Sequence, residues 1–359
     1  MTMTSSDTYV LHGLKLSYFT GKLEAYFRAK GIPFRYVEMD MADFRACAKA
    51  TGIAQMPQVE TPSGEWLTDT TAIIKHFEAM GEAPSLSPQD PATAFCSLLL
   101  EDLFDEWFWR PALYYRWAFD EDAKLMSAQI ARTMMRDMPM PFFVRRQFIL
   151  WRQRKVFLAQ DGVTKATAPT IETLYMDVLR ELEAIFSKRP FLFGEGPCEA
   201  DFGLFGPFFR HFFSDPTPGA LMRENAPNVA HWVTRLWRTR PEDLEGVASI
   251  DGVSGDLQFF FDLAANDYLP YLEANSAAFV AGKTNTTYTV QGVQWTVPTA
   301  PYRVQCFNVL KKKFAMLDDT AKTQIANLLD APSIGLLQGS IVPMEETENR
   351  TGLRDRLWK

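Results

Sequence analysis

Cysteine and histidine are scarce in this chain, with four of each among 359 residues. The cysteines, at positions 47, 96, 198 and 306, are widely spaced and form no C-x-x-C motif. Scattered single cysteines are typical of a reduced compartment and not of a disulfide framework. The histidines are equally dispersed, and no cluster has the ligand spacing that a zinc site requires. The sequence therefore predicts a cytoplasmic protein that binds no metal ion.

Positive charge and long apolar runs are also limited. Lys and Arg number 37 against 44 Asp and Glu, and the net charge of −7 argues against non-specific binding to nucleic acid. Gly, Pro and charged residues interrupt the longest apolar runs, such as 202–213, before they reach membrane-spanning length. Residues 1–8 lack the pattern of a secretory signal. We expect neither an integral membrane segment nor export.

Aromatic residues are abundant, and the first eighty positions alternate between two local patterns. The chain has 28 Phe and 9 Trp within 47% apolar residues, enough to fill large cores. Strand patterns are found at 9–12 and 34–38, and a Pro/Gly turn predicts a hairpin of 58–61 and 65–68. Helical spacing predicts helices at about 22–30 and 69–80, and a third around Phe44 and Cys47. This β-α-β-α-β-β-α order, with Pro57 before the third strand, is what a thioredoxin-like domain requires.

After a proline-rich linker at 84–91, strand patterns are absent until about residue 285. Helical patterns occupy about 92–118, 122–136, 142–160, 170–188, 199–213 and 227–239. Beyond residue 250, apolar residues on both sides of Gln291-Gly292 predict a hairpin with Tyr288, Val290, Val293 and Trp295 on one face. A helix is expected to follow at about 301–317, and the hairpin and helix would form a small cap on the helical domain.

These patterns predict an α+β fold in three parts. The first part, 1–83, is the thioredoxin-like domain. The second, 90–250, is an all-helical domain. The third, 251–359, is a small C-terminal extension with a hairpin and a helix.

Four short motifs follow one another along the first 201 residues. Residues 17–24 place hydroxyl groups where a strand pattern gives way to a helix, and a helix start favours negative charge. Met56-Pro57 precedes a short strand, Asp69-Thr70 begins a helix, and residues 198–201 begin another. From about residue 9 to about residue 240, this series resembles the soluble glutathione transferase superfamily. The resemblance implies glutathione as cosubstrate, a small electrophile as second substrate, and a homodimer.

The resemblance also implies that one hydroxyl near the first helix stabilises the glutathione thiolate. A free thiol has a pKa of about 8.5. A hydrogen bond to a charged group is worth about 1.5–3 kcal/mol, and about 1.4 kcal/mol is one pKa unit, so a single hydroxyl suffices. Counted without gaps from Gly31, Ser17 matches the activating serine of the serine-type classes and Thr20 the hydroxyl that follows it. Tyr18 matches the tyrosine-type classes if the preceding loop is shortened, and all three could instead only cap the helix.

Two further motifs match residues that hold glutathione in this superfamily. Pro57 is expected after a cis peptide bond, with the Met56 backbone pairing with the cysteinyl part of the tripeptide. Gln55 matches a frequent Gln or Lys. Asp69 would hold the ammonium of the γ-glutamyl end, and Thr70 its carboxylate. The structural alternatives are a trans edge residue at 57, a solvated loop residue at 55 and a simple helix cap at 69.

Five aromatic residues crowd one early helix of the second domain: Trp107, Trp109, Tyr114, Tyr115 and Trp117. In this superfamily the corresponding helix lines the pocket for the electrophile, so we predict that Trp107 and Tyr114 line it here. Aromatic residues at helical spacing more often belong to a core, and the sequence does not say which face of the helix looks into the cleft.

The predicted function is therefore that of a glutathione transferase-like enzyme, whether it conjugates, isomerises or cleaves reductively. The alternative is a non-catalytic binding or scaffold protein of the same fold. Thr70 and Cys198 favour that alternative because serine is usual at both positions of the family pattern, and so does the unmatched region after residue 250. A thiol–disulfide oxidoreductase is disfavoured because no cysteine lies near the start of the first helix.

Overall fold

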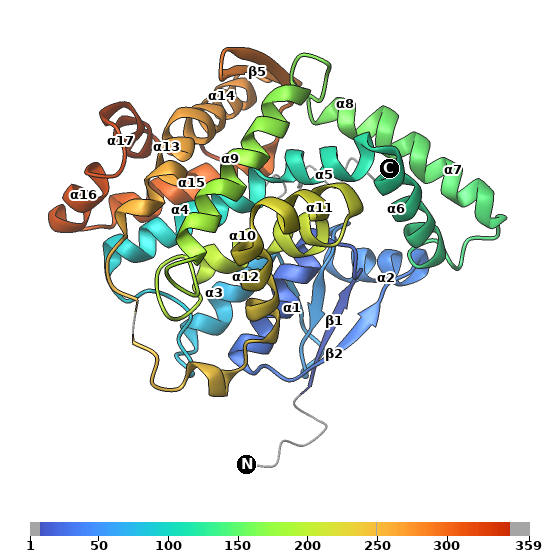
Figure 1. Ribbon diagram of the computed structural model, residues 1–359, viewed down its shortest axis with the longest axis horizontal. Coiled ribbons are helices and arrows are strands. Elements are labelled where there is room, and N and C mark those ends of the chain that lie inside the picture. Colours follow the sequence, from blue (N-terminus) through green and yellow to red (C-terminus); the bar gives the residue numbers. More distant parts are fainter. Residues whose placement is uncertain (1–7, 249, 345–359) are drawn as a thin grey trace.

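The computed structural model describes residues 8–248 and 250–344. Its first part is a four-stranded sheet of order β2-β1-β3-β4, accompanied by three helices (Figure 1). Strands β1 and β2 are parallel, whereas β3 is antiparallel to both β1 and β4. The elements are β1 (Tyr9–Gly13), α1 (Tyr18–Lys30), β2 (Phe34–Glu38), α2 (Met41–Thr51), β3 (Gln58–Glu60), β4 (Trp66–Thr68) and α3 (Thr70–Ala79). The predicted β-α-β-α-β-β-α order is confirmed.

The second part contains only helices within the described residues. They are α4 (Pro91–Glu106), α5 (Trp109–Ala118), α6 (Asp120–Arg132), α7 (Phe142–Arg152), α8 (Leu158–Gln160), α9 (Ala168–Phe186), α10 (Glu199–Pro207), α11 (Pro216–Asn225) and α12 (Pro227–Arg238). Short π-helical segments follow α7 and α10. Helix α4 packs against α10, and α10 packs in turn against α1, so the two parts share a buried interface.

The buried helix α10 begins without a cap from its own N-cap side chain. The thiol of Cys198 makes no cap hydrogen bond, as expected of a weak acceptor. The Ser97 hydroxyl of α4 accepts from the Ala200 N–H group at 3.3 Å instead, and Asp201 accepts from the Cys198 N–H group at 3.1 Å. A neighbouring helix therefore supplies the acceptor that the motif lacks.

The C-terminal extension packs on α4 (orange to red in Figure 1). Its elements are α13 (Gln258–Leu263), α14 (Leu269–Val280), β5 (Asn285–Val290), β6 (Val293–Pro298), α15 (Pro301–Ala315), α16 (Asp319–Ala326) and α17 (Ala331–Gln338). The predicted hairpin is confirmed, with Tyr288 opposite Trp295 and Val290 opposite Val293.

The extension shares its core with the rest of the chain. The Phe314 ring lies 5.5 Å from that of Phe95 in α4, and the Tyr268 hydroxyl donates to Asp102 at 2.7 Å. The largest cluster of buried apolar side chains runs from Leu11 to Leu337. The extension is therefore a cap fixed to the helical part. Among residues 8–248 and 250–344, no helix is both long enough and apolar enough to cross a membrane.

Candidate active site

A cleft lies where the sheet-containing part meets α4, α5 and the extension. It consists of two adjoining hollows that share Phe19, Gln55, Met56, Trp109 and Phe157. The first hollow, about 790 Å³ including its open mouth, is also lined by polar residues: Asp69, Thr70, Asp105, Glu106, Tyr302 and Arg303. The second, about 890 Å³, is lined mostly by apolar side chains, including Leu14, Leu16, Leu113, Trp117, Ile130 and Met134. A polar and an apolar ligand group would fit side by side.

Ser17 lies at the start of α1 on the wall of the apolar hollow. Its Oγ atom accepts from the Thr20 N–H group at 3.4 Å, and no acceptor within the described residues takes its hydroxyl proton. The guanidinium of Arg116, which is paired with Asp215, donates to the Leu16 carbonyl at 2.8 Å. A cation thus holds the loop just before Ser17. A hydroxyl at a helix start favours an anion at this place.

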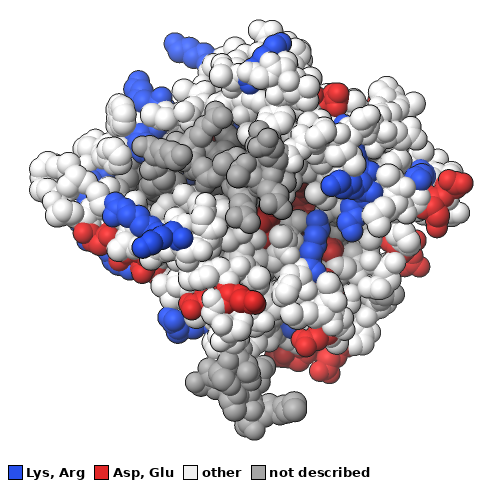
Figure 2. Space-filling model, turned by 180° about the vertical axis from the view of Figure 1, so that it is seen from behind, with Lys and Arg blue, Asp and Glu red and all other residues white. Residues whose placement is uncertain are grey.

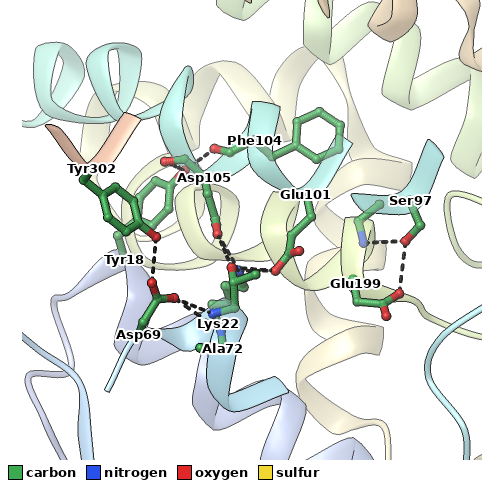
Figure 3. Close-up of polar contacts among 12 residues, drawn as sticks. Tyr18, Lys22, Asp69, Ala72, Ser97, Glu101, Phe104, Asp105, Glu199 and Tyr302 are labelled. Atoms are coloured by element: carbon green, nitrogen blue, oxygen red, sulfur yellow. Dashed lines mark hydrogen bonds and ion pairs between the residues drawn. The ribbon is translucent and has the colours of Figure 1, made fainter. Parts of the chain in front are cut away.

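Tyr18 and Thr20 direct their hydroxyl groups away from the cleft. The Tyr18 ring lines the apolar hollow, but its hydroxyl donates to the backbone carbonyls of Phe104 and, at 3.2 Å, Asp105 (Figure 3). The Thr20 hydroxyl is fully buried and accepts from the Leu14 N–H group at 3.4 Å. Of the three predicted hydroxyls, the one that the structure leaves facing the cleft is that of Ser17.

The loop before β3 lies between the two hollows. The Met56–Pro57 peptide bond is cis, as predicted. The Gln58 side chain donates to the carbonyls of Ile53 at 2.8 Å and Gln55 at 3.0 Å, and so fixes the loop. Within the described part of the chain, the Met56 backbone makes no hydrogen bond. Its N–H and C=O groups can therefore pair with the backbone of a bound peptide.

Asp69 and Thr70 form the turn into α3 at the polar hollow. Asp69 has φ 70°, which is rare for a residue with a side chain. Its Oδ1 atom accepts from the N–H groups of Thr71 at 3.0 Å and Ala72 at 3.3 Å, so the residue does cap the helix. The Thr70 hydroxyl has no partner in the described chain. A carboxylate and a hydroxyl thus lie together at a helix start.

A buried charge cluster supports this turn from behind (Figure 3). Lys22 of α1 is fully buried and bonds Glu101 at 2.7 Å, Asp105 and the Thr71 hydroxyl at 3.1 Å. Burial alone would lower the pKa of Lys22, but the two carboxylates raise it, so the side chain stays an ammonium. Burial, with Glu101 nearby, raises the pKa of Asp105 despite Lys22. The cluster joins α1, α3 and α4 just beneath the polar hollow.

Four of the residues that line the polar hollow are carboxylic acids, and a fifth is the cation Arg303, which is paired with one of them, Glu106. The other three acids are Asp69, Asp105 and Asp161. Burial raises the pKa of Asp161 to about 6, although Arg110 and Arg303 oppose the effect. On the face of the molecule seen in Figure 2, acidic and basic side chains are interspersed and form no broad patch of one sign. Within the described residues, no group of three or more His, Cys, Asp or Glu is arranged to hold a metal ion.

The structure places Trp107 and Tyr114 outside the cleft. The Trp107 ring lies against Tyr268 and Tyr271 of the extension, and the Tyr114 hydroxyl donates to Glu172 of α9. The residues of this segment that line the apolar hollow are Trp109, Leu113, Arg116 and Trp117. The cause is a break between α4 and α5, which turns the two predicted residues toward other helices.

Sequence reasoning missed Arg116, Tyr302 and Arg303. Arg116 carried a weak signal, because a cation among closely spaced aromatic residues needs a buried partner. Tyr302 and Arg303 carried none, since they lie more than fifty residues beyond the region of resemblance and reach the cleft only through the packing of α15 on α4.

Comparison with known proteins bears on this arrangement. The family model for the glutathione S-transferase N-terminal domain matches residues 11–85, and that for the C-terminal domain matches residues 141–239. The chain belongs to the glutathione S-transferase superfamily. No curated protein matches it.

Solved structures similar to this glutathione S-transferase superfamily member include three that span two thirds of it. Beta-etherase LigF from Sphingobium sp. strain SYK-6 has 21% identity and a TM-score of 0.47 over 66% of this chain and 97% of that one. A glutathione S-transferase from Methylobacterium radiotolerans, in complex with glutathione sulfonate, has 18% identity and a TM-score of 0.39. The match covers 69% of this chain and 98% of that one. Rice GST1, in complex with glutathione, has 18% identity and a TM-score of 0.42. The match covers 67% of this chain and 94% of that one.

Proposed function

We propose that this glutathione S-transferase superfamily member is an enzyme that activates the glutathione thiol for attack on a small electrophile. The observation that supports the proposal most directly is the position of Ser17. Its hydroxyl faces the cleft at the start of α1, close to the free Met56 backbone and the Asp69-Thr70 turn. In this proposal the three sites take the sulfur, the cysteinyl backbone and the γ-glutamyl end of one tripeptide.

In this proposal Ser17 donates its hydroxyl proton in a hydrogen bond to the glutathione sulfur. The start of α1 adds a favourable interaction with the thiolate. Each interaction stabilises the charged thiolate and not the neutral thiol, so the pKa of the bound thiol falls. The thiolate is the nucleophile for every reaction that such an enzyme performs.

The electrophile would occupy the apolar hollow beside Ser17. Trp109 and Trp117 line it, so an apolar or aromatic electrophile fits best. Conjugation, isomerisation and reductive cleavage all begin with the same thiolate. We further propose a cytoplasmic homodimer, in keeping with the superfamily, which light scattering would report as twice the mass of the chain.

Glutathione binding is the first test. At free glutathione a hundredfold above its dissociation constant, the native state should gain about 2.7 kcal/mol, seen as a higher melting temperature. Thr70→Val removes a hydroxyl from the proposed γ-glutamyl site. The increase in melting temperature on adding glutathione should therefore be smaller in this variant than in the wild type. An unchanged melting temperature of the wild type at millimolar glutathione would contradict the proposal. A rise without a lowered thiol pKa, and without turnover on a panel of electrophiles, would favour the non-catalytic alternative.

A further inference from the structure

The C-terminal extension contributes two side chains to the polar hollow. Tyr302 and Arg303, at the start of α15, line it together with Asp69, Thr70, Asp105 and Glu106. All residues of this hollow that the family motifs predict come from the first seventy positions. The hollow is therefore completed by a segment that neither family-model match includes.

Tyr302 makes a direct contact with the proposed glutathione site. Its hydroxyl donates to Oδ2 of Asp69 at 2.9 Å, across 233 positions of sequence (Figure 3). The other oxygen of Asp69 accepts from the N–H groups at the start of α3. Both carboxylate oxygens are thus held, one by the helix and one by the extension. Burial and the charge of Asp69 raise the pKa of Tyr302, so the phenol keeps its proton and remains a donor.

Arg303 fixes the start of α15 against α4. Its Nε atom donates to the Glu106 carboxylate at 3.1 Å, and an Nη atom donates to the Glu106 carbonyl at 3.2 Å. Its other Nη atom donates to the Tyr271 hydroxyl at 2.5 Å. A buried guanidinium with a carboxylate partner and a fixed fork geometry is a rigid anchor. The Tyr302 hydroxyl is therefore preorganised against Asp69.

We propose that Tyr302 is a positioning residue for the glutathione site, holding the Asp69 carboxylate so that it can receive the γ-glutamyl ammonium. The inference rests on the proposed function. An ionised carboxylate offers about four acceptor positions, and the three donors around Asp69 leave one for the ammonium. The extension then acts as a built-in part of the cosubstrate site.

The test is Tyr302→Phe, which keeps the ring and removes the donor. Glutathione should bind about tenfold more weakly, because one charge-assisted hydrogen bond no longer orients Asp69. The turnover number at saturating glutathione and the pKa of the bound thiol should stay unchanged, since Tyr302 acts at the end of the tripeptide remote from sulfur. Tyr288→Phe is the matched control, because this extension tyrosine is buried and its hydroxyl has no partner in the described structure.

A double-mutant cycle shows whether Tyr302 acts through Asp69. In an Asp69→Asn background, Tyr302→Phe should weaken binding by less than twofold, because the carboxylate it orients is already gone. Full additivity of the two effects would overturn the inference. So would equal or tighter binding by Tyr302→Phe, which would mean that the phenol competes for Asp69. A fall in turnover and melting temperature without a change in affinity would assign it a merely structural role. Absence of glutathione binding by the wild type would overturn the proposed function, and the inference with it.

Discussion

Ser17→Ala removes the hydroxyl that faces the cleft at the start of α1. If this hydroxyl stabilises the thiolate, the pKa of bound glutathione should rise by about 1–2 units, which is the value of one hydrogen bond to a charged group. Ultraviolet titration of the thiolate measures this change directly and needs no known electrophile.

Tyr18→Phe is the matched control, because the Tyr18 hydroxyl donates to carbonyls of α4 and not into the cleft. The substitution should leave the pKa of the thiol nearly unchanged and lower the stability by about 1 kcal/mol, since it leaves buried acceptors without a donor. A larger pKa change in Tyr18→Phe than in Ser17→Ala would identify this chain with the tyrosine-type classes.

The sequence was informative about which residues gather at the site but not about where each side chain points. Ser17, Tyr18 and Thr20 lie within four positions, and a resemblance of motifs treats their hydroxyls as near equivalents. Their directions depend on neighbours distant in sequence. Tyr18 packs so closely against Gly206 that a Cβ atom there would lie 2.9 Å from its ring, and no local pattern encodes that approach.

At the scale of the element, helix breaks were the main error. The pattern at 92–118 predicted one helix, whereas the structure has two, α4 and α5, which meet at Trp107 and Phe108. Pro111 marks the second start, because a proline is tolerated in the first turn of a helix, where N–H groups lack partners. Helix α11, which begins at Pro216, lies between two of the predicted helical patterns and was not predicted. The break between α4 and α5 determines which face of α5 lines the cleft.

The ammonium of Lys22 joins α1, α3 and α4. We expect the contact between these helices to depend on this cation, and Lys22→Met tests that expectation. The substitution leaves Glu101 and Asp105 buried without their ammonium, and removing one partner of a buried ion pair costs about 3–5 kcal/mol. Urea unfolding of the variant should show a loss of this size.

The control for this substitution is Arg180→Met, which breaks an exposed pair with Asp177 that should contribute less than about 1 kcal/mol. A similar small loss in Lys22→Met would mean that the carboxylates simply take up protons and the cluster is not what holds these helices together.

At the scale of the whole molecule, local patterns identified the elements of the extension but not its place. The alternation around Gln291-Gly292 predicted the hairpin, because strand pairing and side-chain face follow from two-residue periodicity. Its packing on α4 joins residues such as Phe95 and Phe314. A contact between residues so far apart leaves no periodic signal. The division at 83, 90 and 250 therefore stays a prediction about sequence segments, while the buried core runs across them.

The buried carboxyl groups should contribute less to the stability of the fold as the pH rises from about 5 to about 8, because their raised pKa values keep them protonated in the native state at the acidic end of this range. Burial raises the pKa of Glu199 to about 7, and that of Asp102 to about 7. An unfolded Glu has a pKa of about 4.3, so between these values the native state binds more protons than the unfolded state. The contribution of these groups to the free energy of unfolding therefore decreases with pH in this window and levels off above it.

Glu199→Gln removes one of these titrating groups but keeps an acceptor for Ser97. The loss of unfolding free energy between pH 5 and pH 8 should be smaller in this variant than in the wild type by about 2 kcal/mol. Urea unfolding at a series of pH values measures it. The control is Glu245→Gln, at an exposed position. A plot of its free energy of unfolding against pH should run parallel to that of the wild type. A Glu199→Gln curve that also runs parallel would mean that Glu199 ionises in the native state as readily as it does in the unfolded chain.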